Sequence, residues 1–108
     1  MKVVLTLDAR RALASTVRYY DACGRGRDFL TEVVRVSDLI RRHPAIARPI
    51  DDTHRRMPLR GFPYGLIYRI DAGVVRIGAI AANRREPGYW RAISWRVEEA
   101  APAYGEAA

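Results

Sequence analysis

Residues 55–90 read RRMPLRGFPYGLIYRIDAGVVRIGAIAANRREPGYW, and this stretch decides the fold. Apolar and polar residues alternate from residue 62 to residue 70, which predicts a strand. Residues 71–73, Asp-Ala-Gly, supply a hairpin turn. Residues 74–82 are apolar except for Arg76, as expected of a central strand that is covered on both faces. The stretch therefore predicts a small sheet that presents arginines and aromatic side chains at one rim.

The residues before this stretch predict one strand and two helices. Residues 2–7 form a short aliphatic run that is typical of a strand. Asp8 offers an N-cap, and apolar residues at helical spacing predict a helix from about residue 8 to residue 22, which the glycines of CGRGR end. A second helix follows and ends before Pro44, and we expect the two helices to pack as an antiparallel pair. The apolar stripe of the second helix consists of Phe29, Val33, Val36 and Ile40.

The remaining segments complete the predicted architecture. Residues 45–49 are interpreted as a linker, and residues 52–59 as a strand that Pro58 restricts to a sheet edge or a bulge. Residues 89–96 are expected to form one or two helical turns. The sequence thus predicts an α+β fold: an N-terminal strand, an antiparallel helix pair, an antiparallel meander that forms one small sheet, and a short C-terminal helical segment.

Length and composition favour a single folded domain. A chain of 108 residues has room for one modest core, and its hydrophobic content of 49% argues against disorder. We assign residues 1–96 to this domain. Residues 97–108 contain three glutamates and no basic residue, so we interpret them as an acidic, flexible tail.

The charge predicts an anionic partner. The formal net charge is +7, and 18 of the 19 basic residues are arginine, with Lys2 as the only lysine. Arginine grips phosphate or carboxylate in two places and stacks on aromatic rings. The partner is expected to be nucleic acid or an acidic protein segment. The plain alternative is an arginine-rich proteome, in which surfaces carry arginine without a binding role.

Cysteine content and hydropathy favour a cytoplasmic protein. Cys23 is the only cysteine, so no intrachain disulfide can form, and a reducing compartment fits best. No apolar run approaches the roughly 20 residues needed to cross a bilayer, and the first residues lack the features of a signal peptide. We therefore expect no membrane partner, and we expect neither a cofactor nor a metal.

The order strand, helix, helix, meander, together with RGFPYGLIYRI, VRIGAIAANRR and PGYW, resembles the ParE/RelE superfamily of toxins from bacterial type II toxin–antitoxin systems, often labelled plasmid stabilisation proteins. The resemblance covers about residues 2–91. It implies a toxin that a cognate antitoxin neutralises within a hetero-oligomer. RelE-like members cleave messenger RNA on the ribosome without a metal, whereas ParE-like members poison DNA gyrase and are not regarded as enzymes.

A metal-independent endoribonuclease needs a base, an acid and cations around the reacting phosphate. Nuclease relatives usually carry an arginine on the third strand beside the tyrosine, where this chain has Gly65, and lysines on the second strand. A missing phosphate-binding cation costs transition-state stabilisation that nothing nearby obviously restores, so the sequence favours the ParE-like branch. The residues that would serve a nuclease are His54, Arg55, Arg56, Arg84, Arg85 and Tyr89.

For the ParE-like branch, we expect target binding at the end of the last strand. A further departure is Ile93, where many relatives place an arginine, and this departure together with Gly65 keeps open a degenerate module that only binds its antitoxin. Trp90 has a structural alternative as an anchor on the sheet, and Trp95 is assigned no role. The expected target-binding residues are Arg84, Arg85, Tyr89 and Trp90, with Arg69 and Arg76 as contributors; the expected core residues Phe62, Tyr64 and Tyr68 share one face of their strand.

Overall fold

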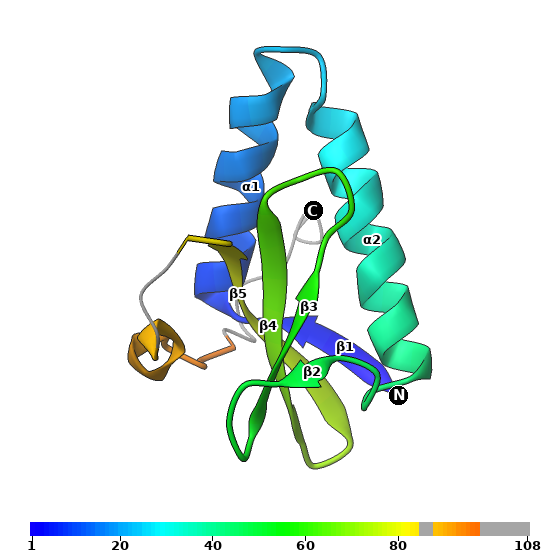
Figure 1. Ribbon diagram of the computed structural model, residues 1–108, viewed down its shortest axis with the longest axis vertical. Helices are drawn as coiled ribbons and strands as arrows, with labels where there is room; N and C mark the ends of the chain where they lie inside the picture. The colour runs from blue at the N-terminus through cyan, green and yellow to red at the C-terminus, as the bar shows by residue number, and fades with distance from the viewer. Residues whose placement is uncertain (85–87, 98–108) are drawn as a thin grey trace, which may run out of the picture.

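The computed structural model describes residues 1–84 and 88–97. Its elements are β1 (Lys2–Leu5), α1 (Leu7–Asp21), α2 (Gly26–Arg42), β2 (Arg48–Pro49), β3 (His54–Pro58), β4 (Tyr64–Asp71), β5 (Val74–Ala82) and a 3₁₀ turn (Tyr89–Ala92). The helix pair forms one layer, and a five-stranded sheet of order β1-β5-β4-β3-β2 forms the other (Figure 1). β1 runs parallel to β5, and the other strand pairs are antiparallel. The predicted α+β fold is confirmed.

Thr6, rather than Asp8, caps α1. The Thr6 hydroxyl accepts a hydrogen bond from the backbone N–H of Ala9 at 3.1 Å and donates one to the carbonyl of Gly78 at 3.2 Å. Thr6 is fully buried, so both hydrogen bonds are shielded from water. Because Thr6 takes the cap, the first strand ends at Leu5, two residues before the predicted end.

The core lies between the helix pair and one face of the sheet. All four residues of the predicted stripe on α2 are buried, and they pack with apolar side chains from β4 and β5. Tyr68 is fully buried and Phe62 is 7% exposed, while Tyr64 is partly buried against the same cluster, so the predicted core face of β4 is confirmed. Full burial of a side chain of this size contributes about 1.5–3 kcal/mol.

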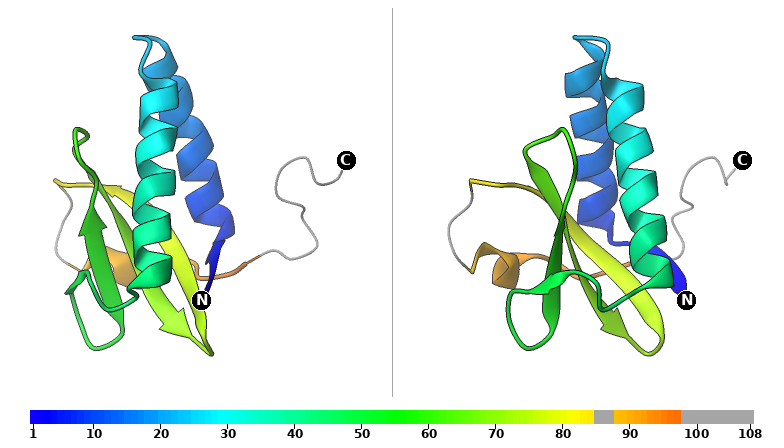
Figure 2. Two further views of the ribbon diagram at one scale, coloured as in Figure 1. Left: turned by 90° about the vertical axis from the view of Figure 1, so that its right-hand side faces the viewer. Right: turned by 45° about the vertical axis from the view of Figure 1, so that its right-hand side comes forward.

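The loop end of the helix pair projects beyond the sheet (Figure 2). Four aromatic rings fill the space between this end and the connection from β3 to β4. The rings of Tyr20 and Phe29 stack with centroids 5.4 Å apart, and each meets the Phe62 ring edge-on, at 4.9 and 5.0 Å. Tyr64 joins them at 5.7 Å from Phe29. Edge-to-face geometry of this kind adds specificity to the burial of the rings.

The turn between β4 and β5 is the predicted hairpin. Ala72 and Gly73 both have positive φ, +50° and +78°, as a two-residue hairpin loop of the primed type requires. Further along, Ile67 pairs with Ala79 but Tyr68 pairs with Ile77, so Gly78 is an extra residue on β5. A β-bulge therefore interrupts the alternation of β5 at this glycine.

The segment predicted to be a linker, residues 45–49, contains the short strand β2, which pairs with the start of β3. The strand predicted for residues 52–59 is shorter and begins at His54. The reason is local: the Asp51 carboxylate accepts hydrogen bonds from the backbone N–H groups of Thr53 and His54, and this holds the preceding residues in a turn. Pro58 ends β3, as its missing N–H favours.

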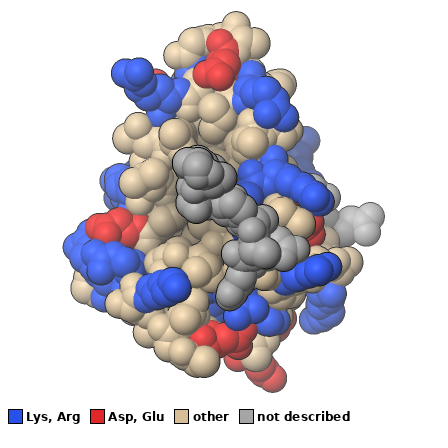
Figure 3. Space-filling model, turned by 180° about the vertical axis from the view of Figure 1, so that it is seen from behind, with Lys and Arg blue, Asp and Glu red and all other residues tan. Residues whose placement is uncertain are grey.

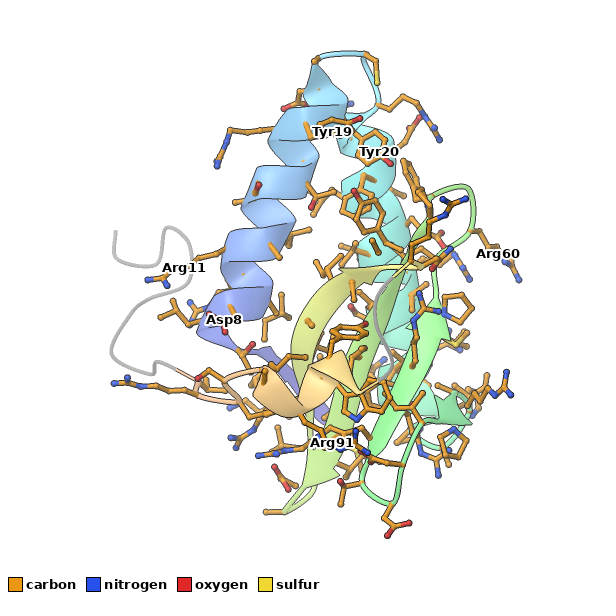
Figure 4. All side chains as sticks on the ribbon, turned by 60° about the vertical axis from the view of Figure 1, so that its left-hand side comes forward. Asp8, Arg11, Tyr19, Tyr20, Arg60 and Arg91 are labelled. Atoms are coloured by element: carbon orange, nitrogen blue, oxygen red, sulfur yellow. The ribbon has the colours of Figure 1, made fainter. Side chains whose placement is uncertain are left out.

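Residues 88–97 cross the second face of the sheet, which is the face away from the helices (Figure 4). The predicted helical segment is limited to the 3₁₀ turn, and residues 93–97 have no regular structure. The backbone N–H of Leu7 donates to the carbonyl of Arg96 at 3.1 Å, which ties the end of this segment to the start of α1. Neither helix is long and apolar enough to span a membrane, a finding that concerns the described residues alone.

Candidate functional site

Three residues singled out from the sequence lie side by side on the second face of the sheet. Strand pairing places His54 of β3 opposite Arg69 of β4, and Arg69 opposite Arg76 of β5. Residues directly opposite each other in antiparallel strands share a face. The fold therefore brings one imidazole and two guanidinium groups into a row across three strands.

Trp95 lies at the centre of this row. Its ring centroid is 5.0 Å from that of His54, and the guanidinium carbon of Arg69 lies 4.7 Å from the ring centre, a cation–π contact. Arg76 donates from Nη1 to the Trp95 carbonyl at 3.2 Å. A Cβ at Gly78 would overlap the Trp95 ring, so glycine at the bulge makes room for the indole. Trp95 was missed by sequence reasoning, and its signal is the glycine in the middle of an apolar strand.

Arg69 and Arg76 are therefore engaged within the fold. Arg69 also donates from Nε to the Asp71 carboxylate at 2.8 Å, and Arg76 Nε lies 3.9 Å from the same oxygen. Both side chains are partly buried. As they stand, they support the segment of residues 88–97 rather than presenting free cations to a partner.

Asp51 joins this segment to the start of β3. Its Oδ2 accepts a hydrogen bond from Trp90 Nε1 at 2.7 Å, and its Oδ1 accepts from the backbone N–H groups of Thr53 at 2.8 Å and His54 at 2.7 Å. His54 Nδ1 lies 2.9 Å from Oδ1. Burial of the Asp51 carboxyl acts to raise its pKa, but the hydrogen bonds from Trp90, Thr53 and His54 together hold the pKa well below its ordinary value. Sequence reasoning missed Asp51, although an Asp two residues before Thr53 is typical of an Asx turn.

His54 is enclosed. Its side chain is 12% exposed, Nδ1 meets Asp51, and Nε2 is buried without a hydrogen-bond partner within residues 1–84 and 88–97. A general base must reach the proton it removes, directly or through a water. The ring of Trp95 lies against the imidazole, so this arrangement does not present His54 as a base.

Two of the other nuclease candidates, Arg55 and Arg84, do not lie beside His54. Adjacent residues of a strand point to opposite faces, and Arg55 donates from Nη1 to the carbonyls of Ala45 at 3.2 Å and Ala47 at 2.7 Å, at the end of the helix layer. Arg84 is exposed and lines a pocket of about 380 Å³ beside Tyr64. Arg85 lies outside the described residues.

Arg56 corrects one inference from the sequence. Its guanidinium lies directly over Gly65, where a Cβ would be 2.6 Å from the guanidinium carbon, and its Nη2 donates to Asn83 Oδ1. The expectation that nothing near Gly65 replaces the arginine that nuclease relatives carry at this position is therefore wrong. A cation from β3 occupies that space because glycine leaves it open.

Tyr89 and Trp90 form an aromatic pair on the 3₁₀ turn. Their ring centroids are 5.7 Å apart in an edge-on arrangement, and the Arg91 guanidinium lies 5.4 Å from the Trp90 ring (Figure 4). Trp90 is half-buried. It faces Asp51, whereas Arg84 lines the pocket beside Tyr64, so the fold separates two members of the rim that the sequence predicted.

Two grooves lie outside this row. The first, which we call the edge groove, has a volume of about 710 Å³ and lies along the β2 edge of the sheet. Its lining residues are Ile46, Ala47, Arg48, Pro49, Ile50, Arg56, Met57, Pro58 and Trp90. The second, which we call the helix groove, has a volume of about 680 Å³ and lies between α1 and α2. Its lining residues are Leu5, Arg10, Leu13, Ala14, Val17, Leu30, Val33, Val34 and Ser37.

Neither charge on the face seen from behind nor metal ligands among the described residues single out another site. Seen from behind, lysine and arginine side chains stand at several separate places rather than in one patch (Figure 3). Within the part of the chain that the structure describes, no three His, Cys, Asp or Glu side chains are grouped to hold a metal ion.

Comparison with known proteins identifies the type of chain. A family model described as "ParE toxin of type II toxin-antitoxin system, parDE" matches residues 3–87. A chain from the solved structure "Chromosomal ParDE TA system from P. aeruginosa" superposes with a TM-score of 0.59 at 16% sequence identity, covering 76% of this chain and 95% of that one. At this identity the likeness shows the fold. A search of curated proteins finds no match.

Proposed function

From the premise that the chain belongs to the ParE toxin family of type II toxin–antitoxin systems, we propose that it arrests growth in the cytoplasm by binding DNA gyrase and that a cognate antitoxin neutralises it. The contact surface would include Arg84, Tyr89 and Trp90, together with Arg85. Arg69 and Arg76 would act indirectly, because they hold the segment that carries the aromatic pair.

The observations that support binding over cleavage are the enclosure of His54 and the separation of Arg55 and Arg84 from it. Arg55 bonds to carbonyl groups at the end of the helix layer, and the His54 ring is enclosed by Asp51 and Trp95. Cleavage of a phosphodiester without a metal requires an acid, a base and cations around one phosphate. A binding toxin needs only a shaped surface, and two grooves with exposed apolar walls offer one.

The helix groove supports an antitoxin as the second partner. Arg10 is the one charged residue in its lining, while Leu30 and Val34 are 41% and 59% exposed. An amphipathic helix would place its apolar face in such a groove and its acidic face toward the surrounding arginines. Coupled folding of a disordered antitoxin segment would then cover a large part of a small toxin.

A supercoiling assay with purified gyrase tests the target. The protein should inhibit supercoiling, and Arg84→Ala should weaken that inhibition by about tenfold, the typical effect of one charged interface contact. Arg11→Ala on α1 is the matched control and should inhibit like the unaltered protein. Full supercoiling at saturating protein would exclude gyrase as the target.

The second candidate function is a metal-independent messenger RNA endonuclease, and Arg56 is the observation that favours it. Its guanidinium lies where the third strand of nuclease relatives usually carries an arginine. Primer extension on transcripts from arrested cells would show cuts in phase with codons if this function holds. Those cuts should disappear in Arg56→Ala, and a transcript pattern identical to that of uninduced cells would rule the nuclease out.

A further inference from the structure

The edge groove combines charge and apolar surface in one place. Of its nine lining residues two are arginines and none is acidic, and Ile46, Ile50 and Met57 supply aliphatic walls. Arg48 is exposed, and no carboxylate of the described residues forms an ion pair with it. Arg56 is anchored by Asn83, so it contributes a cation of fixed position.

The groove exists because the outermost strand is short. β2 has two residues and pairs only with Arg55 and Arg56. Beyond that point β3 reaches Pro58, which has no N–H to donate. This edge is therefore poorly suited to pairing with an added strand. A partner at this edge would therefore be held by side chains in the groove rather than by extension of the sheet.

Asp51 fixes the wall of the groove that Trp90 forms. The indole N–H is fully used by the Asp51 carboxylate, so Trp90 can offer a partner its ring but not its donor. The same carboxylate binds the turn before β3 through Thr53 and His54. One side chain therefore sets the position of Trp90 relative to β2 and β3, the two sides of the groove.

We propose that the edge groove receives an acidic, partly apolar segment of the target protein, and that Asp51 is the positioning residue that holds its Trp90 wall. The inference rests on the proposed function, since it assigns the target to a particular surface. Two arginines without an acidic neighbour in the groove complement carboxylates, and the aliphatic walls suit leucine-like side chains. Sites for single-stranded nucleic acid instead use successive aromatic platforms along a basic channel, and this groove has one ring.

The positioning role is tested by nuclear magnetic resonance of the two tryptophan indoles. In Asp51→Asn a neutral amide replaces the carboxylate, so in either orientation of the amide Trp90 Nε1 loses its charge-assisted hydrogen bond. The Trp90 indole signal should move toward the position of a free indole and exchange faster with solvent. The Trp95 indole is linked to Asp51 through His54, so its signal should move less than that of Trp90. An unchanged Trp90 signal would overturn the positioning role.

A second variant guards against misfolding. Trp90→Phe removes the indole donor and leaves Asp51 in place, so both Trp90→Phe and Asp51→Asn should weaken target binding, and by similar amounts. The double variant should bind the target no more weakly than either single variant, because both substitutions break the same hydrogen bond. Additive losses in the double variant would contradict the proposed coupling.

The groove is tested by fluorescence anisotropy with two labelled probes, a peptide of alternating glutamate and leucine and an oligouridine. The peptide should bind, and Arg48→Glu should weaken its binding about tenfold. Arg11→Glu carries the same charge change on α1, outside the lining of the edge groove, and should have no effect. Equal loss in both variants, or binding of the oligouridine in place of the peptide, would overturn the protein-segment assignment.

Growth arrest separates this inference from the proposed function. If the unaltered protein arrests growth and Arg48→Glu does not, the groove is the target surface. If Arg48→Glu arrests growth as strongly as the unaltered protein, the groove assignment fails and the toxin function stands. If the unaltered protein does not arrest growth, the proposed function fails, whereas the peptide and indole measurements still decide the groove and Asp51.

Discussion

At the scale of single residues, Gly78 decides whether the second face of the sheet can hold Trp95. Any side chain there would meet the indole ring. We expect Gly78→Ala to lower the free energy of unfolding by about 1–3 kcal/mol, the usual cost of overpacking. Urea denaturation would measure it. Trp95→Ala removes the obstacle, so the cost of Gly78→Ala should largely vanish in that background; an undiminished cost would mean that the strain arises in the backbone.

Asp51 makes the free energy of unfolding depend on pH. Since the folded-state pKa of Asp51 lies below its unfolded value, its contribution is complete above the unfolded pKa, about 3.9 for an aspartate, and is lost as the pH falls through the folded pKa. The unfolding free energies of the unaltered protein and Asp51→Asn should therefore differ most near neutral pH. Denaturation below about pH 4 should show the two converging. A difference independent of pH would mean that the pKa of Asp51 is the same in the folded and unfolded states.

The residues that sequence reasoning missed share a physical cause. Asp51 and Trp95 act through partners that are distant along the chain, Trp90 and Gly78. Periodicity reports which face a side chain takes within one element, but not which segment later covers that face. Gly65 shows the same limit. The sequence shows that this position lacks a side chain, but it does not show that the guanidinium of Arg56 lies above it.

At the scale of elements, the start of α1 depends on one hydroxyl. Thr6→Ala removes the cap on the Ala9 N–H and the hydrogen bond to the Gly78 carbonyl. We expect a loss of about 1–3 kcal/mol in unfolding free energy, measured by thermal denaturation followed by circular dichroism. Asp8→Ala is the control, since Asp8 lies in the first turn and is not the cap. Its effect should stay within about 1 kcal/mol, the typical contribution of a first-turn charge; a larger effect than that of Thr6→Ala would restore Asp8 as the cap.

Local signals predicted the elements whose causes are local. The stripe on α2, Gly24 after α1 and the turn at Ala72 and Gly73 each depend on neighbours in sequence, and each lies where the sequence placed it; Gly26, the second predicted stop, instead begins α2. β2 and the bulge at Gly78 arise from pairing between strands, which no window of sequence contains. The parallel pairing of β1 with β5 likewise joins strands that the helix pair and three further strands separate along the chain.

At the scale of the whole molecule, the helix groove and the edge groove lie on different elements, one between the helices and the other along the sheet edge. A toxin with separate surfaces for its target and its antitoxin can lose one activity and retain the other. Under the proposed function, this separation would let a chain of 108 residues bind both partners while its second sheet face is occupied by its own residues 88–97.

Val34 offers the sharpest test of that separation. Its side chain lines the helix groove and is 59% exposed, so Val34→Glu should leave the fold intact while placing a carboxylate where an acidic amphipathic helix would bind. Antitoxin affinity, measured by calorimetry, should fall about a hundredfold, the effect of a hot-spot change with like-charge repulsion. Thr31→Glu adds the same charge to α2 outside the groove and should bind the antitoxin normally.

In cells, Val34→Glu should still arrest growth but escape rescue by co-expressed antitoxin. Rescue as complete as that of the unaltered toxin would place the antitoxin on another surface, and loss of toxicity would show that the two grooves do not act separately.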